Sequence, residues 1–194
     1  MRVGVIAAEL EGQRTGVGRY LEGMLRGLAS WDHGWEWHLF FQGEAVEGPA
    51  GGDPRVVRHQ AGDRGSRVLW EQAKLPRELR RHPLDLVLGP AYALPWGLRT
   101  PAVVVLHDLS FELLPEEFRP RERWRRRLLA RQAARRADRV LTDTAHVAGL
   151  VRARYRVPVE RLGVVPLGID LAGFTAQPRA DDEGRRAALG VRAP

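Results

Sequence analysis

The run R-V-G-V-I-A-A at residues 2–8, followed by T-G-V-G-R-Y at residues 15–20, decides the expected fold. Nearly continuous apolar residues over 2–8 are typical of a strand buried on both faces of a parallel sheet. A helix pattern follows, with apolar residues at Tyr20, Leu21, Met24, Leu25 and Leu28. Two glycines where that helix begins let the backbone approach a ligand and leave N–H groups free, which attracts phosphate above all.

Strand and helix patterns alternate along the rest of the chain. Further strands are expected at Glu36–Phe41, Arg55–His59, Leu84–Leu88, Ala102–Leu106, Arg139–Leu141 and Leu162–Val165. Helices are expected at 66–81, with a kink or a division at Pro76, and at about 121–137, 144–155 and 180–189. The alternation predicts an α/β fold: a doubly wound, mostly parallel, Rossmann-like sheet with helices on both faces. We expect residues 1–170 to form this domain and residues 171–194 to be an interdomain linker or tail.

Composition excludes several classes of protein. The chain has 194 residues and no cysteine, which excludes disulfide scaffolds and thiolate metal sites and is compatible with a reducing compartment. No apolar run approaches the roughly 20 residues of a membrane span. The net charge of +7 comes almost entirely from arginine, because Lys74 is the only lysine. That pattern is more typical of genomic composition bias than of nucleic-acid binding. We expect a cytoplasmic protein, at most peripheral to the inner membrane face.

Ligands of such sheets bind beyond the C-terminal ends of the strands, so candidate site residues are those that follow strands. They are the loop 9–19, the turn Gly89-Pro90-Ala91, His107-Asp108, Asp143-Thr144 and the segment 167–170.

The glycine loop matches neither common nucleotide motif. A dinucleotide site needs a third glycine, where this chain has Leu21, and an acidic residue after the second strand, where it has Phe40-Phe41-Gln42. A P-loop needs Gly-Lys-Ser/Thr, which does not follow. The alternative that Gly16 and Gly18 only shape a turn stays open.

His107 directly follows the strand 102–106. A histidine there can donate a hydrogen bond to a substrate hydroxyl or phosphate, and it can titrate near neutrality. The alternative is a histidine satisfied by a nearby backbone carbonyl. No second histidine lies at ligand spacing from it, so we expect no metal.

An arginine-rich run extends from Arg119 to Arg139. The residues Trp124, Leu128, Leu129, Ala133 and Ala137 are expected to form a buried stripe, with the arginines over the other faces. Two interpretations stay open for those faces. In the first, these faces are only a solvated surface. In the second, they contact anionic lipid headgroups or an anionic acceptor.

Taken in order, the motifs resemble a known family. T-G-V-G-R-Y (15–20), W-E-Q-x-x-L-P (70–76), D-L-V-L-G-P (85–90), V-V-V-L-H-D-L-S-F (103–111) and V-V-P-L-G-I-D (164–170) resemble the N-terminal domain of family 4 glycosyltransferases. Members of that family are retaining enzymes with the two-domain GT-B fold. The resemblance covers essentially the whole chain.

The resemblance implies a division of labour. The N-terminal domain would bind the acceptor, which is a sugar, a glycan or a lipid-linked sugar, and a C-terminal domain would hold the nucleotide-diphosphate sugar. By matching position, Gly16, Val17, Gly18 and Arg19 would approach the donor diphosphate and the acceptor. His107 would contact the transferred sugar and stabilise its oxocarbenium character, with Asp108 as a second catalytic candidate. Further cleft candidates are Tyr20, Thr144, Gly168 and Asp170.

Retention in that family is explained by front-face attack, in which the leaving phosphate helps to deprotonate the acceptor. No cofactor or metal is implied. The family's donor-binding half has no counterpart in this sequence, so we expect an excised domain or a truncated gene product that cannot transfer sugar alone. Two alternatives remain: a non-catalytic module that binds a glycan or an anionic surface, and a nucleic-acid or membrane-surface protein that uses its arginines.

Overall fold

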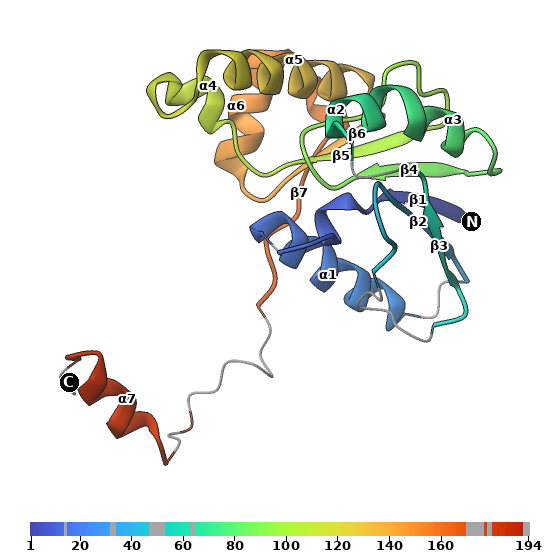
Figure 1. Ribbon diagram of the computed structural model, residues 1–194. Coiled ribbons are helices and arrows are strands. Elements are labelled where there is room, and N and C mark those ends of the chain that lie inside the picture. Colours follow the sequence, from blue (N-terminus) through green and yellow to red (C-terminus); the bar gives the residue numbers. More distant parts are fainter. Residues whose placement is uncertain are drawn as a thin grey trace.

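The computed structural model describes residues 1–13, 15–31, 34–46, 53–62, 65–169, 177 and 180–191. Seven parallel strands form one sheet in the order β3-β2-β1-β4-β5-β6-β7 (Figure 1). Their bounds are Arg2–Ile6, Glu36–Phe41, Val56–Gln60, Leu86–Gly89, Ala102–Leu106, Arg139–Thr142 and Leu162–Val164 for β1 to β7. The predicted doubly wound parallel α/β sheet is confirmed. The chain runs outward from β1 to β3 and then returns to β4, so the strand order reverses between β1 and β4.

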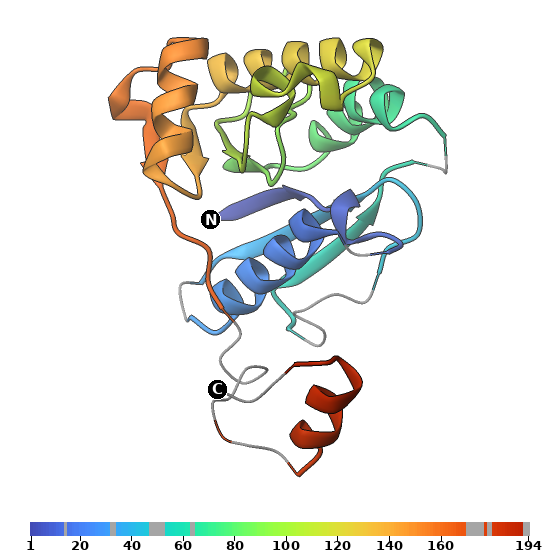
Figure 2. The same cartoon turned by 90° about the vertical axis from the view of Figure 1, so that its left-hand side faces the viewer.

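Helices cover both faces of the sheet, unevenly (Figure 2). The helix α1 (Gly16–Ala29) lies on one face, where Leu21 and Leu25 pack with Leu39 of β2. The other face carries α2 (Arg67–Leu69), α3 (Leu75–Leu79), α5 (Pro120–Arg136) and α6 (Ala145–Tyr155). The structure also forms the helices α4 (Ser110–Leu113) and α7 (Asp182–Ala188) and short 3-10 helices at Ala8–Leu10, Pro115–Glu117 and Val159–Arg161.

The helix predicted at 66–81 is divided, as Pro76 suggested. A π-helical turn at Trp70–Lys74 joins α2 to α3, and Pro76 stands in the first turn of α3. Proline has no N–H to donate, so the wider turn forms where the regular ladder cannot continue. The buried Trp70 donates from its indole Nε1 to the Ala61 carbonyl at 3.0 Å, which ties this segment to the loop after β3.

The predicted burial of the arginine-rich helix is wrong in two places. Trp124 is 66% exposed and Leu128 is 37% exposed. Leu129 and a stripe of alanines face the sheet instead, at Ala130, Ala133, Ala134 and Ala137. A helix turns about 100° per residue, so Trp124, five residues before Leu129, lies well away from that stripe. Alanine side chains let α5 approach the sheet closely, and the larger residues are left on the outer surface.

Within the described part of the chain, none of the helices has the length and apolar character that a membrane span requires.

Candidate active site

Four elements meet at one edge of the sheet. Parallel strands end on the same side, so the residues after β4, β5 and β6 gather there, and α1 begins there after β1. Pro90 follows β4, His107 follows β5 and Asp143 follows β6. This edge includes the reversal of strand order between β1 and β4, where crevices form in such sheets.

His107 lies at the centre of this arrangement. Its Nδ1 is 2.8 Å from Asp143 Oδ2, and its Nε2 is 3.0 Å from the Pro90 carbonyl oxygen. Both partners are acceptors, so both contacts are hydrogen bonds only when both ring nitrogens carry protons. The Asp143 carboxylate would balance the resulting charge, and the His107 side chain remains partly open to solvent.

Tyr20, the fifth residue of α1, links this helix to His107. The two rings meet edge to face, with centroids 4.6 Å apart and planes at 76°. Burial, and then the negative charge of Asp143, raise the pKa of the Tyr20 phenol. The phenol therefore stays protonated at neutral pH and adds a neutral polar group to the site.

The start of α1 is open to a ligand. The helix follows Thr15, whose side chain makes no capping hydrogen bond, and its first turn contains no acidic residue. A Cβ placed on Gly16 would meet no atom within 4 Å, so packing does not require glycine there. Gly18 is buried, whereas Val17 is partly buried and Arg19 is exposed. Free N–H groups, the helix dipole and the space above Gly16 suit an anion.

Two of the predicted site residues have local hydrogen-bonding roles. Asp108 is exposed, and its Oδ1 accepts from the Ser110 N–H at 2.8 Å and the Ser110 hydroxyl at 2.5 Å, at the start of α4. The Thr144 hydroxyl caps α6 by accepting from the Val147 N–H at 3.2 Å. Gly168 is exposed, and Asp170 lies outside the described residues.

Asp143 is the residue whose role the sequence reasoning missed. It was placed among the residues that follow strands, but only its neighbour Thr144 was singled out. The signal was available, because β5 pairs with β6 and residues directly after neighbouring parallel strands lie side by side.

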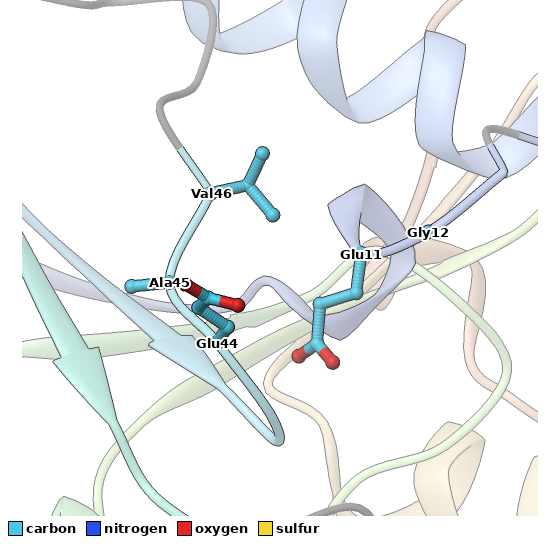
Figure 3. Close-up of a pocket in the computed structure, with 5 residues that line it drawn as sticks. All are labelled: Glu11, Gly12, Glu44, Ala45 and Val46. Atoms are coloured by element: carbon cyan, nitrogen blue, oxygen red, sulfur yellow. The ribbon is translucent and has the colours of Figure 1, made fainter.

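A hollow of about 670 Å³ lies further along the edge, by the loops after β1 and β2. Figure 3 shows Glu11 and Gly12 on one side and Glu44, Ala45 and Val46 on the other. The Glu11 carboxylate accepts from the backbone N–H groups of Gln42 at 2.5 Å and Gly43 at 3.1 Å, so it fixes the loop after β2. Glu11 belongs to the candidate loop 9–19, whereas Glu44 lies outside every candidate segment.

The W-E-Q motif (70–72) and the neighbouring Arg67 make hydrogen bonds from the other face of the sheet to loops at the same edge. Arg67 Nε donates to Glu71 Oε1 at 2.6 Å, and Arg67 Nη2 donates to Glu9 Oε1 at 3.0 Å. Gln72 Oε1 accepts from the Trp96 N–H at 2.8 Å. The motif thus joins the π-helical turn to the loops after β1 and β4.

The fold and this edge define a class of protein. It is a doubly wound α/β domain with a helix N-terminus and a carboxylate-bound histidine beyond the C-terminal ends of its strands.

Comparison with known protein families shows which family this chain belongs to. The model of Glycosyltransferase Family 4 matches residues 14–172, and the chain belongs to that family. The predicted family resemblance is confirmed. No curated protein sequence matches the chain significantly.

Solved structures show the same fold. The chain superposes on a sucrose-phosphate synthase from Thermosynechococcus elongatus with a TM-score of 0.67 and 17% identity, over 98% of this chain and 53% of that one. It superposes on the Anabaena protein HepE, solved in complex with UDP and glucose, with a TM-score of 0.60 and 18% identity, over 98% of this chain and 50% of that one. The chain spans about half the length of these structures.

Proposed function

We propose that this chain supplies the acceptor side of a retaining glycosyltransferase that uses a nucleotide-diphosphate sugar. The observation that carries the proposal is the convergence of Tyr20 of α1, Asp143 and Pro90 on His107. Family membership supports the reaction class, and the UDP and glucose of HepE support the class of donor.

The proposed chemistry relies on position and charge. The N–H groups at the start of α1 would face the donor diphosphate, next to the open space at Gly16. His107, held by Asp143 through Nδ1, would turn its Nε2–H from the Pro90 carbonyl toward the sugar and stabilise charge as the bond between the anomeric carbon of the sugar and the phosphate breaks. The acceptor oxygen then bonds to the same face of that carbon, and its proton passes to the leaving phosphate. This scheme preserves the anomeric configuration and requires no metal at this site.

The acceptor would approach along the same edge. The hollow between Glu11 and Glu44 offers carboxylate oxygens, which accept hydrogen bonds from sugar hydroxyls, and an apolar contact from Val46. Because the chain spans about half of the matched structures, we further propose that a second domain beyond the segment 171–194 holds the nucleotide.

The test compares the 194-residue chain with the full natural gene product that contains it. Each is incubated with a panel of UDP-, GDP- and ADP-sugars and candidate acceptors, and release of nucleoside diphosphate is measured. We expect turnover from the full product only, and proton NMR should show that the anomeric configuration of the donor is kept. Inversion would overturn the mechanism, and turnover by the chain alone would overturn the division of labour. Glycan binding without turnover in either would identify a binding module instead.

The outer face of α5 supports peripheral contact with an anionic membrane from the cytoplasmic side. Trp124 and Leu128 are exposed there, beside Arg127 and Arg131, which line one hollow with them. An exposed indole among arginines suits the headgroup region of a bilayer.

Sedimentation with vesicles tests this contact. We expect binding to vesicles that contain phosphatidylglycerol, weak binding to phosphatidylcholine alone, and a severalfold loss of binding in Trp124→Ser. Trp31→Ser is the matched control, because Trp31 is also exposed but lies just after α1. Equal binding to both kinds of vesicle, or equal loss in both variants, would argue against α5 as the contact surface.

A further inference from the structure

Three histidines that are far apart in sequence meet on one face of the sheet. They are His38 of β2, His59 of β3 and His82, which follows α3. One ring nitrogen from each lies within 4.8 Å of the others. His38 Nδ1 and His59 Nε2 are only 2.9 Å apart.

The register of the strands and the end of α3 create this histidine cluster. His59 pairs with Phe40, which lies two residues after His38. The side chains of His38, Phe40 and His59 therefore lie on the same face of the sheet. The His59 ring stacks on Phe40 with centroids 4.7 Å apart, and His82 lies 4.1 Å from His59 between centroids. His38 is buried, and the other two rings are partly exposed, which leaves an approach from solvent.

Carboxylates lie beside the rings of His38 and His82. Glu36 Oε1 is 3.3 Å from His38 Nε2, and Glu78 Oε1 is 3.3 Å from His82 Nε2. His38 Nε2 is nevertheless a buried nitrogen with no hydrogen bond. Each carboxylate also pairs with an arginine, Glu36 with Arg2 and Glu78 with Arg81. Histidine ligands of metal ions commonly have a carboxylate next to their second nitrogen.

We propose that His38, His59 and His82 form a binding site for a divalent transition-metal ion, of which Zn²⁺ is the best match. Three imidazoles are a donor set that suits zinc, and Zn–N bonds of about 2.0–2.1 Å place tetrahedral ligand nitrogens roughly 3.3 Å apart. The three nitrogens lie within 4.8 Å of one another, so binding requires the rings to turn until all three nitrogens face the ion. His38 would bind through Nδ1 and His59 through Nε2, the two nitrogens that already face each other.

The surroundings also favour the form of histidine that binds metals. Burial, followed by the charges of His82 and His38, lowers the pKa of His59 to about 4. Burial is also the main cause that lowers the pKa of His38, while Glu36 acts in the opposite direction. The proton that lies between His38 Nδ1 and His59 Nε2 would have to move to the other nitrogen of its ring before both nitrogens bind the ion.

The site would be structural. It lies within the strands, whereas His107 lies beyond the C-terminal ends of the strands, so it would take no part in sugar transfer. A bound ion would tie the hydrogen-bonded pair β2 and β3 to the segment after α3. The inference is independent of the proposed function.

Isothermal titration of the 194-residue chain with ZnCl₂, with any affinity tag removed, tests the proposal. We expect one equivalent of Zn²⁺ to bind and the midpoint of thermal unfolding to rise. Co²⁺ should produce the visible absorption of tetrahedral coordination. His59→Gln and His82→Gln should each lose at least tenfold in Zn²⁺ affinity.

The matched control is His146→Gln on α6, which removes an exposed histidine outside the cluster and should bind Zn²⁺ as the original chain does. Circular dichroism checks that each variant folds. His82→Gln, which alters a partly exposed side chain in a loop, keeps the test decisive if His59→Gln does not fold. Absence of stoichiometric binding, or equal affinity in all the variants, would overturn the proposal and leave a hydrogen-bonded histidine stack.

Discussion

His107 and the cluster of His38, His59 and His82 differ in what surrounds their rings. His107 stands between two acceptors, the Asp143 carboxylate and the Pro90 carbonyl. The nearest ring-nitrogen partner of His38 is another imidazole, His59. The first setting offers an acceptor to each ring nitrogen, and the second places imidazole rings against one another. One residue type can therefore bond to acceptors at the edge of a sheet and pack against its own kind on the face of the sheet.

The difference shows that the place of a histidine in the fold decides its chemistry. Beyond the ends of β4, β5 and β6, backbone carbonyls and loop side chains supply acceptors. Between β2 and β3 the backbone groups are used by the ladder, so side chains have to satisfy one another. The predictions below test the two halves of this contrast.

The largest effect is expected at the edge site. In the full gene product, Asp143→Asn keeps a group of the same size but removes the charge that balances His107, and kcat for sugar transfer should fall roughly 100-fold. His107→Gln should fall at least as far. Nucleoside diphosphate release measures both, and Glu160→Gln, an exposed acid elsewhere, is the control. Full activity of Asp143→Asn would show that the carboxylate does not act through His107.

A smaller effect is expected at the start of α1. Gly16→Ala places a methyl group in space that no protein atom occupies, so stability should be unchanged or slightly higher while the KM for the donor rises about tenfold. Gly89→Ala is the contrasting variant, because its Cβ would lie 2.9 Å from the Ala93 carbonyl oxygen. Overpacking there should cost about 1–3 kcal/mol of stability. Thermal unfolding and donor kinetics distinguish the two variants. An unchanged KM in Gly16→Ala would show that the donor does not bind at the start of α1.

The smallest effect concerns the histidine cluster and pH. Since the pKa of His59 is about 4 in the folded chain and about 6.5 in the unfolded one, the unfolded chain binds more protons between these values. Stability should therefore fall as the pH drops from 6.5 to 4 and should lose nothing further from this group below 4. Partial exposure screens the effect to the order of 1 kcal/mol. Urea unfolding across this range should show a shallower slope in His59→Gln and an unaltered slope in His146→Gln.

Much of the fold could be predicted because apolar runs report burial directly. The strand at Ala102–Leu106 was predicted to the residue, since its run is uninterrupted and a polar His-Asp pair ends it. The strand predicted at 84–88 forms at Leu86–Gly89 instead. Leu84 packs against the core from outside the strand, so its apolar character reported burial and not pairing.

The sites were less predictable, because they depend on register. His107 was found from its position after a strand, and Asp143 needed the further knowledge that β5 pairs with β6. The histidine cluster could not be found from spacing, since its members are brought together by the pairing of β2 with β3 and by the end of α3. The outward position of Trp124 escaped prediction because arginines surround α5 on most sides and leave little periodicity to follow.

The π-helical turn at Trp70–Lys74 has a consequence for how this chain tolerates insertions and deletions. Such a turn holds about one residue more than an α-helical turn does, so deleting one residue there would restore a regular helix. The cost would be a rotation of about 100° of everything before the deletion relative to everything after it. Trp70 would then leave the Ala61 carbonyl and Arg67 would leave Glu9. Variants that shorten this segment should therefore gain helical regularity and lose the connection between the helix and the edge of the sheet.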